Sequence, residues 1–140
     1  MINNMKPNLE KELCAVAIYL YGDYISIDDA SRLFSLTPTK FKNKGDKRIT
    51  STGSEIVSKV GMWEHTITVA RDDISKSVRE ILAGVEGDKI LGRFGIEHAE
   101  IDIFFTFDHD EEFYGFSIKL DDESLRRMAD LGLDLIITAR

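Results

Sequence analysis

The amino-acid sequence predicts one α+β domain with a mostly antiparallel or mixed sheet and helices on one face of it. Strand-like segments follow one another both directly and across helical segments, in the order β-α-β-β-α-β-β-α-β. The length of 140 residues and the hydrophobic content of 43% suit a single core of ordinary size. We therefore expect the domain to span residues 10–140, after a flexible N-terminal arm over residues 1–9.

The first two elements are expected to be a central strand and a short helix. Residues 13–21 are almost continuously apolar, as in a strand that is covered on both faces. Ser26 precedes Asp29 by three positions, which resembles a capping box and predicts a helix that continues to Phe34. Cys14 lies within the apolar run, so its thiol should be buried, and as the single cysteine it can form no internal disulfide.

A basic region follows in an otherwise acidic chain. Residues 37–52 contain Pro38, Gly45 and a concentration of Lys and Arg, so any strand here should be short, exposed or at a sheet edge. Cations flank Phe41 in the segment 40–48, a pattern that also occurs on nucleic-acid-binding surfaces. The net negative charge disfavours that interpretation. An edge protected against aggregation, or a contact with a protein partner, explains the pattern equally well.

The middle of the chain combines a strand with the best-defined helix. Residues 57–69 recover strand character, and Trp63 and His65 share one face, which predicts a strand covered on that face. Asp72 or Asp73 is expected to begin the following helix. The apolar residues of this helix recur at helical spacing and should face the core: Ile74, Val78, Ile81, Leu82 and Val85.

A hairpin is expected closer to the C-terminus. Residues 101–107 and 114–120 both alternate between apolar and other side chains, which predicts two strands joined by a tight connection. Acidic residues crowd the predicted tip: Asp108, Asp110, Glu111 and Glu112.

The last two elements are expected to be a helix and a strand. Asp121 or Asp122 should cap the helix, because carboxylates at a helix N-terminus accept hydrogen bonds from its free amides and complement its dipole. Gly132 should end the helix before a strand over residues 133–138.

The sequence shows no motif for catalysis, cofactor binding or metal binding. His65, His98 and His109 are too far apart in the chain for a compact metal-ligand pattern. No serine lies in a nucleophile elbow, and the glycines within residues 87–95 lack the strand and helix of a phosphate-binding loop. We therefore expect a binding protein rather than an enzyme. The alternative is a small-molecule-binding or enzymatic domain with a pocket near Trp63 and His65.

The charge and hydropathy of the chain narrow the choice of partner. Lys and Arg number 18 against 25 Asp and Glu, a net charge of −7 that repels nucleic acid and anionic membranes and attracts basic partners. The N-terminus lacks the apolar segment of a secretory signal, and no apolar run approaches the roughly 20 residues that span a bilayer. We expect a cytoplasmic protein that is monomeric or weakly self-associating.

Several short features, in their order and spacing, resemble a family of small bacterial proteins. They lie within about residues 12–139 and comprise GlyAsp at 22–23, ThrProThr at 37–39, Gly45, Trp63, GlyPhe at 115–116 and the closing segment 125–137. The family is a domain of unknown function whose members are associated with immunity to polymorphic toxins and with contact-dependent inhibition. The resemblance implies an immunity protein that binds one cognate toxin domain, a nuclease being a reasonable first guess, and blocks it by occlusion.

Under that hypothesis, acidic residues are the candidates for binding a basic toxin surface. The first group is the predicted hairpin tip, with Asp108, Asp110, Glu111 and Glu112. Asp121 and Asp122 form the second group, for which helix capping is the competing explanation.

Overall fold

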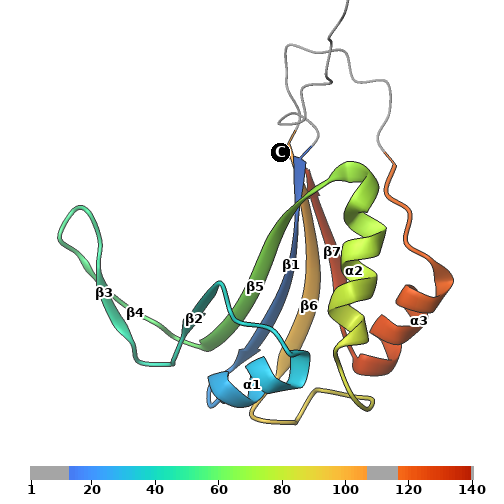
Figure 1. The fold of residues 1–140 in the computed structure, drawn as a ribbon. Coiled ribbons are helices and arrows are strands. Elements are labelled where there is room, and N and C mark those ends of the chain that lie inside the picture. The colour runs from blue at the N-terminus through green and yellow to red at the C-terminus, as the bar shows by residue number, and fades with distance from the viewer. Residues whose placement is uncertain (1–12, 107–116, 140) are drawn as a thin grey trace, which may run out of the picture.

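The computed structural model describes residues 13–106 and 117–139, in which five strands form a mixed sheet and three α-helices accompany it (Figure 1). In chain order the elements are β1 (Leu13–Gly22), α1 (Ile27–Phe34), β2 (Lys40–Lys42), β3 (Lys47–Ile49), β4 (Glu55–Val57), β5 (Gly61–Ala70), α2 (Ile74–Ala83), β6 (His98–Phe105), α3 (Asp122–Leu131) and β7 (Asp134–Ala139). A short 3-10 helix, Arg71–Asp73, precedes α2. The predicted α+β fold class is confirmed.

The sheet has β1 at its centre and the strand order β2-β5-β1-β6-β7. β1 pairs antiparallel with β5 and β6, β2 pairs antiparallel with β5, and β7 runs parallel to β6. The parallel pair needs a crossover connection, and α3 lies within it. β3 and β4 pair with each other in a separate two-stranded ribbon that extends away from the sheet (Figure 1). We call this ribbon, residues 47–57, the arm.

The second strand of the predicted C-terminal hairpin is not confirmed. Residues 117–120 have no regular secondary structure, and residues 114–116 lie outside the described part of the chain. β6 instead has β7 as its neighbour on the side away from β1. Ile118 and Leu120 are partly buried against the hydrophobic core, so their alternation reflects packing rather than strand pairing.

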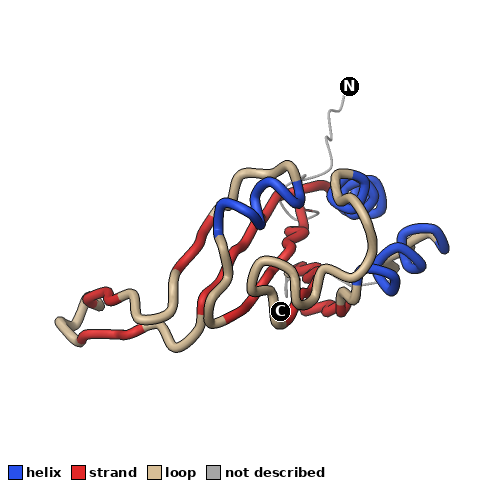
Figure 2. Tube along the Cα trace, turned by 90° about the horizontal axis from the view of Figure 1, so that it is seen from below, coloured by secondary structure: helices blue, strands red, loops and turns tan. Residues whose placement is uncertain are grey.

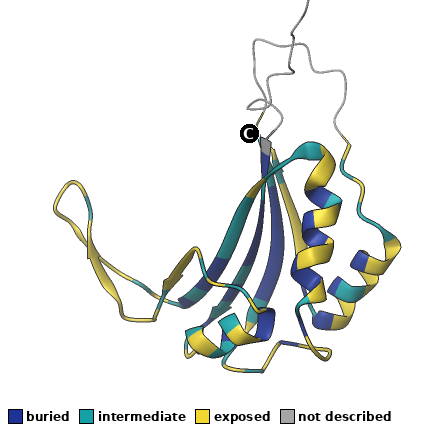
Figure 3. Cartoon of the chain, in the orientation of Figure 1, coloured by how far each residue is buried: buried dark blue, intermediate teal, exposed yellow. Residues whose placement is uncertain are grey.

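The hydrophobic core fills the space between the sheet and the helices. Side chains alternate along a strand, and Val16, Ile18 and Leu20 of β1 are completely buried on the side of the helices. All three α-helices lie on this side (Figure 2), as expected, and the buried strands contrast with the exposed arm (Figure 3). The expectation that β1 is the central strand is confirmed, and on the face opposite the helices Ala17 is buried while Tyr19 and Tyr21 are half-buried.

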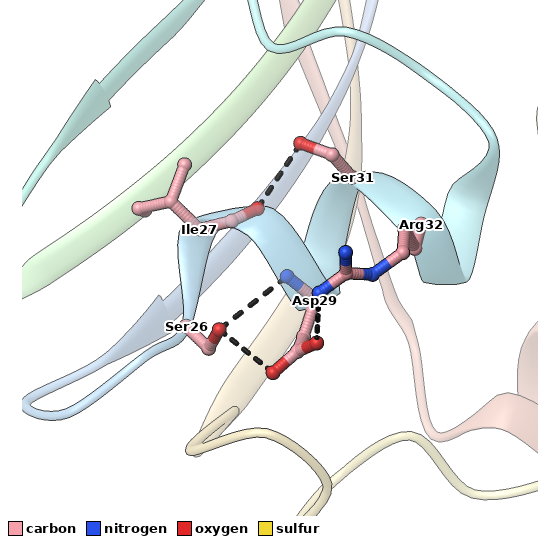
Figure 4. A network of polar contacts seen from close by, with 5 residues as sticks. All are labelled: Ser26, Ile27, Asp29, Ser31 and Arg32. Carbon is pink, nitrogen blue, oxygen red and sulfur yellow. Dashed lines mark hydrogen bonds and ion pairs between the residues drawn. The ribbon is translucent and has the colours of Figure 1, made fainter.

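A capping network fixes the start of α1 (Figure 4). Ser26 Oγ accepts a hydrogen bond from the Asp29 amide at 3.3 Å and donates to Asp29 Oδ2 at 2.8 Å. Arg32 donates to the other carboxylate oxygen of Asp29 at 2.7 Å, and these hydrogen bonds lower the pKa of Asp29. Ser31 Oγ donates to the carbonyl of Ile27 at 3.0 Å. The predicted helix start at Ser26 is therefore confirmed.

The other two helices begin and end close to their expected positions. A 3-10 turn containing Asp72 and Asp73 leads into α2. Asp121 caps α3 by accepting from the Ser124 amide at 2.6 Å, and Gly132 ends α3 with a φ of 83°, a left-handed conformation that glycine adopts readily. None of the helices in the described residues is long and apolar enough to cross a membrane.

Candidate functional site

The face of the sheet opposite the core carries no helix in the described part of the chain (Figure 2), and we call it the open face. Because successive side chains of a strand point to opposite faces, the residues between the core positions project from the open face. On the three central strands these residues include Tyr19 and Tyr21 of β1, Glu64 and Thr66 of β5, and Glu100 and Asp102 of β6.

Three carboxyl groups gather on the open face. Glu64, Glu100 and Asp102, which we call the acidic cluster, are each only 8% exposed. Tyr19 is the register partner of both Glu64 and Glu100, and Ala17 is the register partner of Asp102. The antiparallel pairing of β5, β1 and β6 therefore concentrates negative charge around the centre of the sheet.

Only some carboxylate oxygens of the acidic cluster have hydrogen-bond partners among the described residues. Thr66 Oγ1 donates a 2.6 Å hydrogen bond to Glu64 Oε2, and His98 Nε2 lies 2.9 Å from Glu100 Oε1. Asp102 Oδ1 is buried and has no hydrogen-bond partner among the described residues.

The electrostatics of the cluster favour proton binding at neutral pH. Burial, a hydrogen bond with Glu100 and the negative charges of Glu100 and Glu64 raise the pKa of Asp102 to about 7. A neighbouring cation would favour the ionised form of Asp102. The open face therefore has the chemistry of a site for a positively charged group.

Two tyrosines lie beside the acidic cluster. The rings of Tyr19 and Tyr21 are parallel, with 6.0 Å between their centroids, and Tyr21 also stacks with His98 at 5.9 Å. Burial is the largest cause that raises the pKa of both hydroxyls, that of Tyr21 to about 12, so both keep their protons at neutral pH. Half-exposed tyrosines are frequent anchors in protein interfaces because they combine a large apolar area with a hydroxyl group.

The described residues do not offer a metal centre. They contain no group of three or more His, Cys, Asp or Glu side chains arranged to hold a metal ion.

The acidic residues that the sequence suggested for toxin binding fall into two groups, one outside the described residues and one at the start of α3. The predicted hairpin tip, with Asp108, Asp110, Glu111 and Glu112, lies outside the described residues. Asp121 caps α3 and lies 3.4 Å from Arg79. The hydrogen bond from the Ser124 amide is the largest cause that lowers its pKa. Asp122 pairs with Arg126 one turn later at 3.5 Å. Both aspartates are thus occupied by contacts within or beside α3.

Trp63 and His65 lie on the core side of β5. Trp63 is fully buried, as predicted, and its indole nitrogen donates to Ser31 Oγ at 3.0 Å. Its ring stacks on Phe34 with a centroid separation of 5.7 Å. His65 Nδ1 lies 2.7 Å from the carbonyl of Thr37. The indole is therefore part of the packed core between β5 and α1.

The basic region, residues 37–52, contains β2, which lies at the edge of the sheet opposite β7. β2 is an edge strand of three residues, as expected, and the arm follows it in the chain. The arm is highly exposed, and Ile49, Ile56 and Val57 on it have exposed fractions of 77%, 39% and 47%. A groove lies between β2 and the base of the arm.

Sequence reasoning missed the acidic cluster. The sequence contains a signal for two of its three residues, because Glu64 and Asp102 occupy polar positions of predicted strands in which apolar and polar side chains alternate. Glu100 precedes the predicted start of its strand at residue 101, whereas β6 begins at His98. The strand order β5-β1-β6 brings the three residues together.

Comparison with known proteins gives one match. Residues 12–139 match the family model described as Domain of unknown function (DUF4279). No curated protein and no solved structure matches the chain.

Proposed function

The chain belongs to the DUF4279 family of domains of unknown function, and we propose that it is an immunity protein that binds and neutralises a basic toxin domain through the open face. The observation that carries this proposal is the acidic cluster: three acidic residues, each only 8% exposed, on a sheet face that no described helix covers. Burying like charges together costs free energy, and a site that retains them is a candidate for binding a cation.

The proposed mechanism is occlusion. Lys or Arg side chains of the toxin would approach Glu64, Glu100 and Asp102, and the ionised carboxylates would accept their hydrogen bonds. Tyr19 and Tyr21 would supply the apolar contact area that slows dissociation. The net charge of −7 would accelerate the encounter with a basic surface. The complex would form in the cytoplasm, with one copy of the chain for each toxin domain.

A protection assay tests this proposal. The reading frame immediately upstream is sequenced first, and if it encodes a large secreted protein, the C-terminal domain of that protein is the partner to express. Cells that produce the toxin domain together with the chain should grow, and the two proteins should copurify in equal amounts. Growth arrest despite soluble chain, or the absence of a complex, would contradict the proposal.

A second candidate is an enzyme or small-molecule-binding domain, and Asp102 is the residue that favours it. A carboxyl group with a pKa near the operating pH suits general acid–base catalysis, and the His98–Glu100 contact lies in the same strand. A thermal-shift screen with small molecules distinguishes the candidates. An enzyme should be stabilised by a compound in the absence of any protein partner, and Asp102→Asn should abolish that stabilisation.

A further inference from the structure

A groove of about 870 Å³ separates β2 from the base of the arm, on the edge of the sheet farthest from β7. We call it the basic groove. Its cationic lining residues are Lys40, Lys42, Lys47, Arg48 and Lys59, whereas its single acidic lining residue is Asp46. Asp46 is already engaged, since its carboxylate accepts a 2.7 Å hydrogen bond from the Asn43 amide.

Most of the positive charge of the groove is not neutralised. Lys47 lies 3.5 Å from Glu55 on the arm. The other four cations form no ion pair with any residue that the structure describes; they are Lys40, Lys42, Arg48 and Lys59. This concentration of unpaired cations in a chain with a net charge of −7 creates a local field opposite to that of the whole molecule.

Apolar side chains accompany these cations. Phe41, Ile56 and Val57 line the groove, and their exposed fractions are 57%, 39% and 47%. Lysines alone would protect an edge strand against aggregation, but exposed apolar residues at the same edge do the opposite. The combination is therefore better explained by a binding site than by protection of the edge.

The backbone of the groove is suited to an extended ligand. β2 is an edge strand that pairs with β5 on one side. Backbone hydrogen bonds from Gly45 to Ser58 and from Ser58 to Asp46, both 2.8 Å, hold the base of the arm together. The other edge of β2 has no strand partner among the described residues, and all three residues of β2 line the groove, so an additional strand can bind there by pairing with β2.

We propose that the basic groove binds an extended, acidic peptide segment of another protein, which pairs with the edge of β2. Alternating acidic and apolar side chains of such a segment would contact the lysines and Arg48 on one side and the apolar residues on the other. A single-stranded nucleic acid fits the groove less well, because Phe41 is its single aromatic lining residue and stacking on aromatic rings provides much of the affinity for unpaired bases. This proposal is independent of the acidic cluster and of the toxin.

Fluorescence anisotropy with the purified chain tests the proposal. The probe is a labelled peptide of alternating Glu and Val or Phe, about six residues long, at low ionic strength. Three comparison probes are the same peptide with Lys in place of Glu, the same peptide with methylated backbone nitrogens at alternate positions, and a single-stranded oligonucleotide of about 12 nucleotides. The acidic peptide should bind, and the basic and methylated peptides should not.

Charge reversal locates the site. The double variant Lys40→Glu/Arg48→Glu should weaken binding of the acidic peptide by at least about tenfold, whereas Lys76→Glu on the exposed side of α2 should change it by less than about twofold. Phe41→Ala is a second variant at the same site and should also weaken binding, without any change of charge. Equal binding to wild type and to the groove variants would overturn the proposal. Tighter binding of the oligonucleotide than of the acidic peptide would replace it with a nucleic-acid site.

Discussion

Lys40 on β2 lies directly opposite Glu64 on β5. Paired residues of neighbouring antiparallel strands project from the same face of a sheet, so the basic groove and the acidic cluster meet between these two residues. The open face consequently has a basic edge at β2 and an acidic centre over β5, β1 and β6. A partner that covers both regions needs the reverse arrangement of charges, and this requirement would select the correct partner over others.

The first prediction concerns the pH dependence of stability. The pKa of Asp102 is about 7 in the folded chain, above the unfolded Asp value of about 3.9. Between about pH 3.9 and pH 7 the carboxyl group of Asp102 is therefore protonated in the folded state and ionised in the unfolded state. The contribution of Asp102 to stability is therefore complete below about pH 4 and is lost as the pH rises to about 7, by at most about 1.4 kcal/mol per pH unit. Asp102→Asn should remove this loss and be more stable than wild type at pH 8.

Urea unfolding of wild type and Asp102→Asn at several pH values measures the effect. The difference between the two free energies of unfolding cancels the titration of all other groups. Asp122→Asn on the exposed start of α3 is the control for the removal of one carboxyl group and should not become more stable than wild type at pH 8. Parallel pH profiles for wild type and Asp102→Asn would show that Asp102 is ionised normally.

The second prediction concerns Trp63. Its complete burial, its stacking on Phe34 and its hydrogen bond to Ser31 place it between β5 and α1. Trp63→Ala should lower the free energy of unfolding by about 3–5 kcal/mol, as large-to-small aromatic substitutions in cores do. Ser31→Ala, which removes the hydrogen bond and keeps the ring, should cost only about 1 kcal/mol. Equal stability of Trp63→Ala and wild type in chemical denaturation would rule out this packing role.

The sequence predicted the elements of this fold better than their arrangement. Ser26 and Gly132 mark helix ends through local hydrogen bonding and backbone conformation, and both were identified because these effects act within a few residues. The alternation around Trp63 likewise predicted its burial. Strand pairing is a long-range property, and the parallel pair β6 and β7 was not predicted, because alternation in residues 114–120 had predicted a hairpin partner for the strand over residues 101–107.

The acidic cluster could not be predicted for the same physical reason. Glu64 and Glu100 are 36 positions apart in the sequence and become neighbours of Tyr19 only through the order β5-β1-β6. Asp121 attracted attention in the sequence because it lies in an acidic run, yet helix capping explains it. The density of acidic residues along the chain therefore pointed to residues that are neighbours in sequence. It could not point to carboxyl groups that only the pairing of strands brings together.

The third prediction separates capping from recognition at α3. Asp121 accepts a hydrogen bond from the Ser124 amide, which lowers the pKa of Asp121. Its stabilising contribution is therefore present above the unfolded pKa and is lost as the pH falls through the folded value. Asp121→Ala should therefore lower the melting temperature at neutral pH and less so in acid. Binding of the partner protein to the folded variant should be unchanged. Weaker binding with an unchanged melting temperature would instead assign Asp121 to the interface.

The most direct test of the proposed function is the affinity for the toxin domain, measured by calorimetry at low and physiological salt. The test variant is Glu64→Gln/Glu100→Gln/Asp102→Asn, and the matched control is Glu80→Gln/Glu86→Gln/Glu123→Gln, which neutralises the same number of carboxyl groups at exposed positions outside the open face. The test variant should remain folded, bind at least about tenfold more weakly and depend less on salt, whereas the control should stay close to wild type. Equal losses of affinity in both variants, or none in the test variant, would contradict a binding role for the acidic cluster.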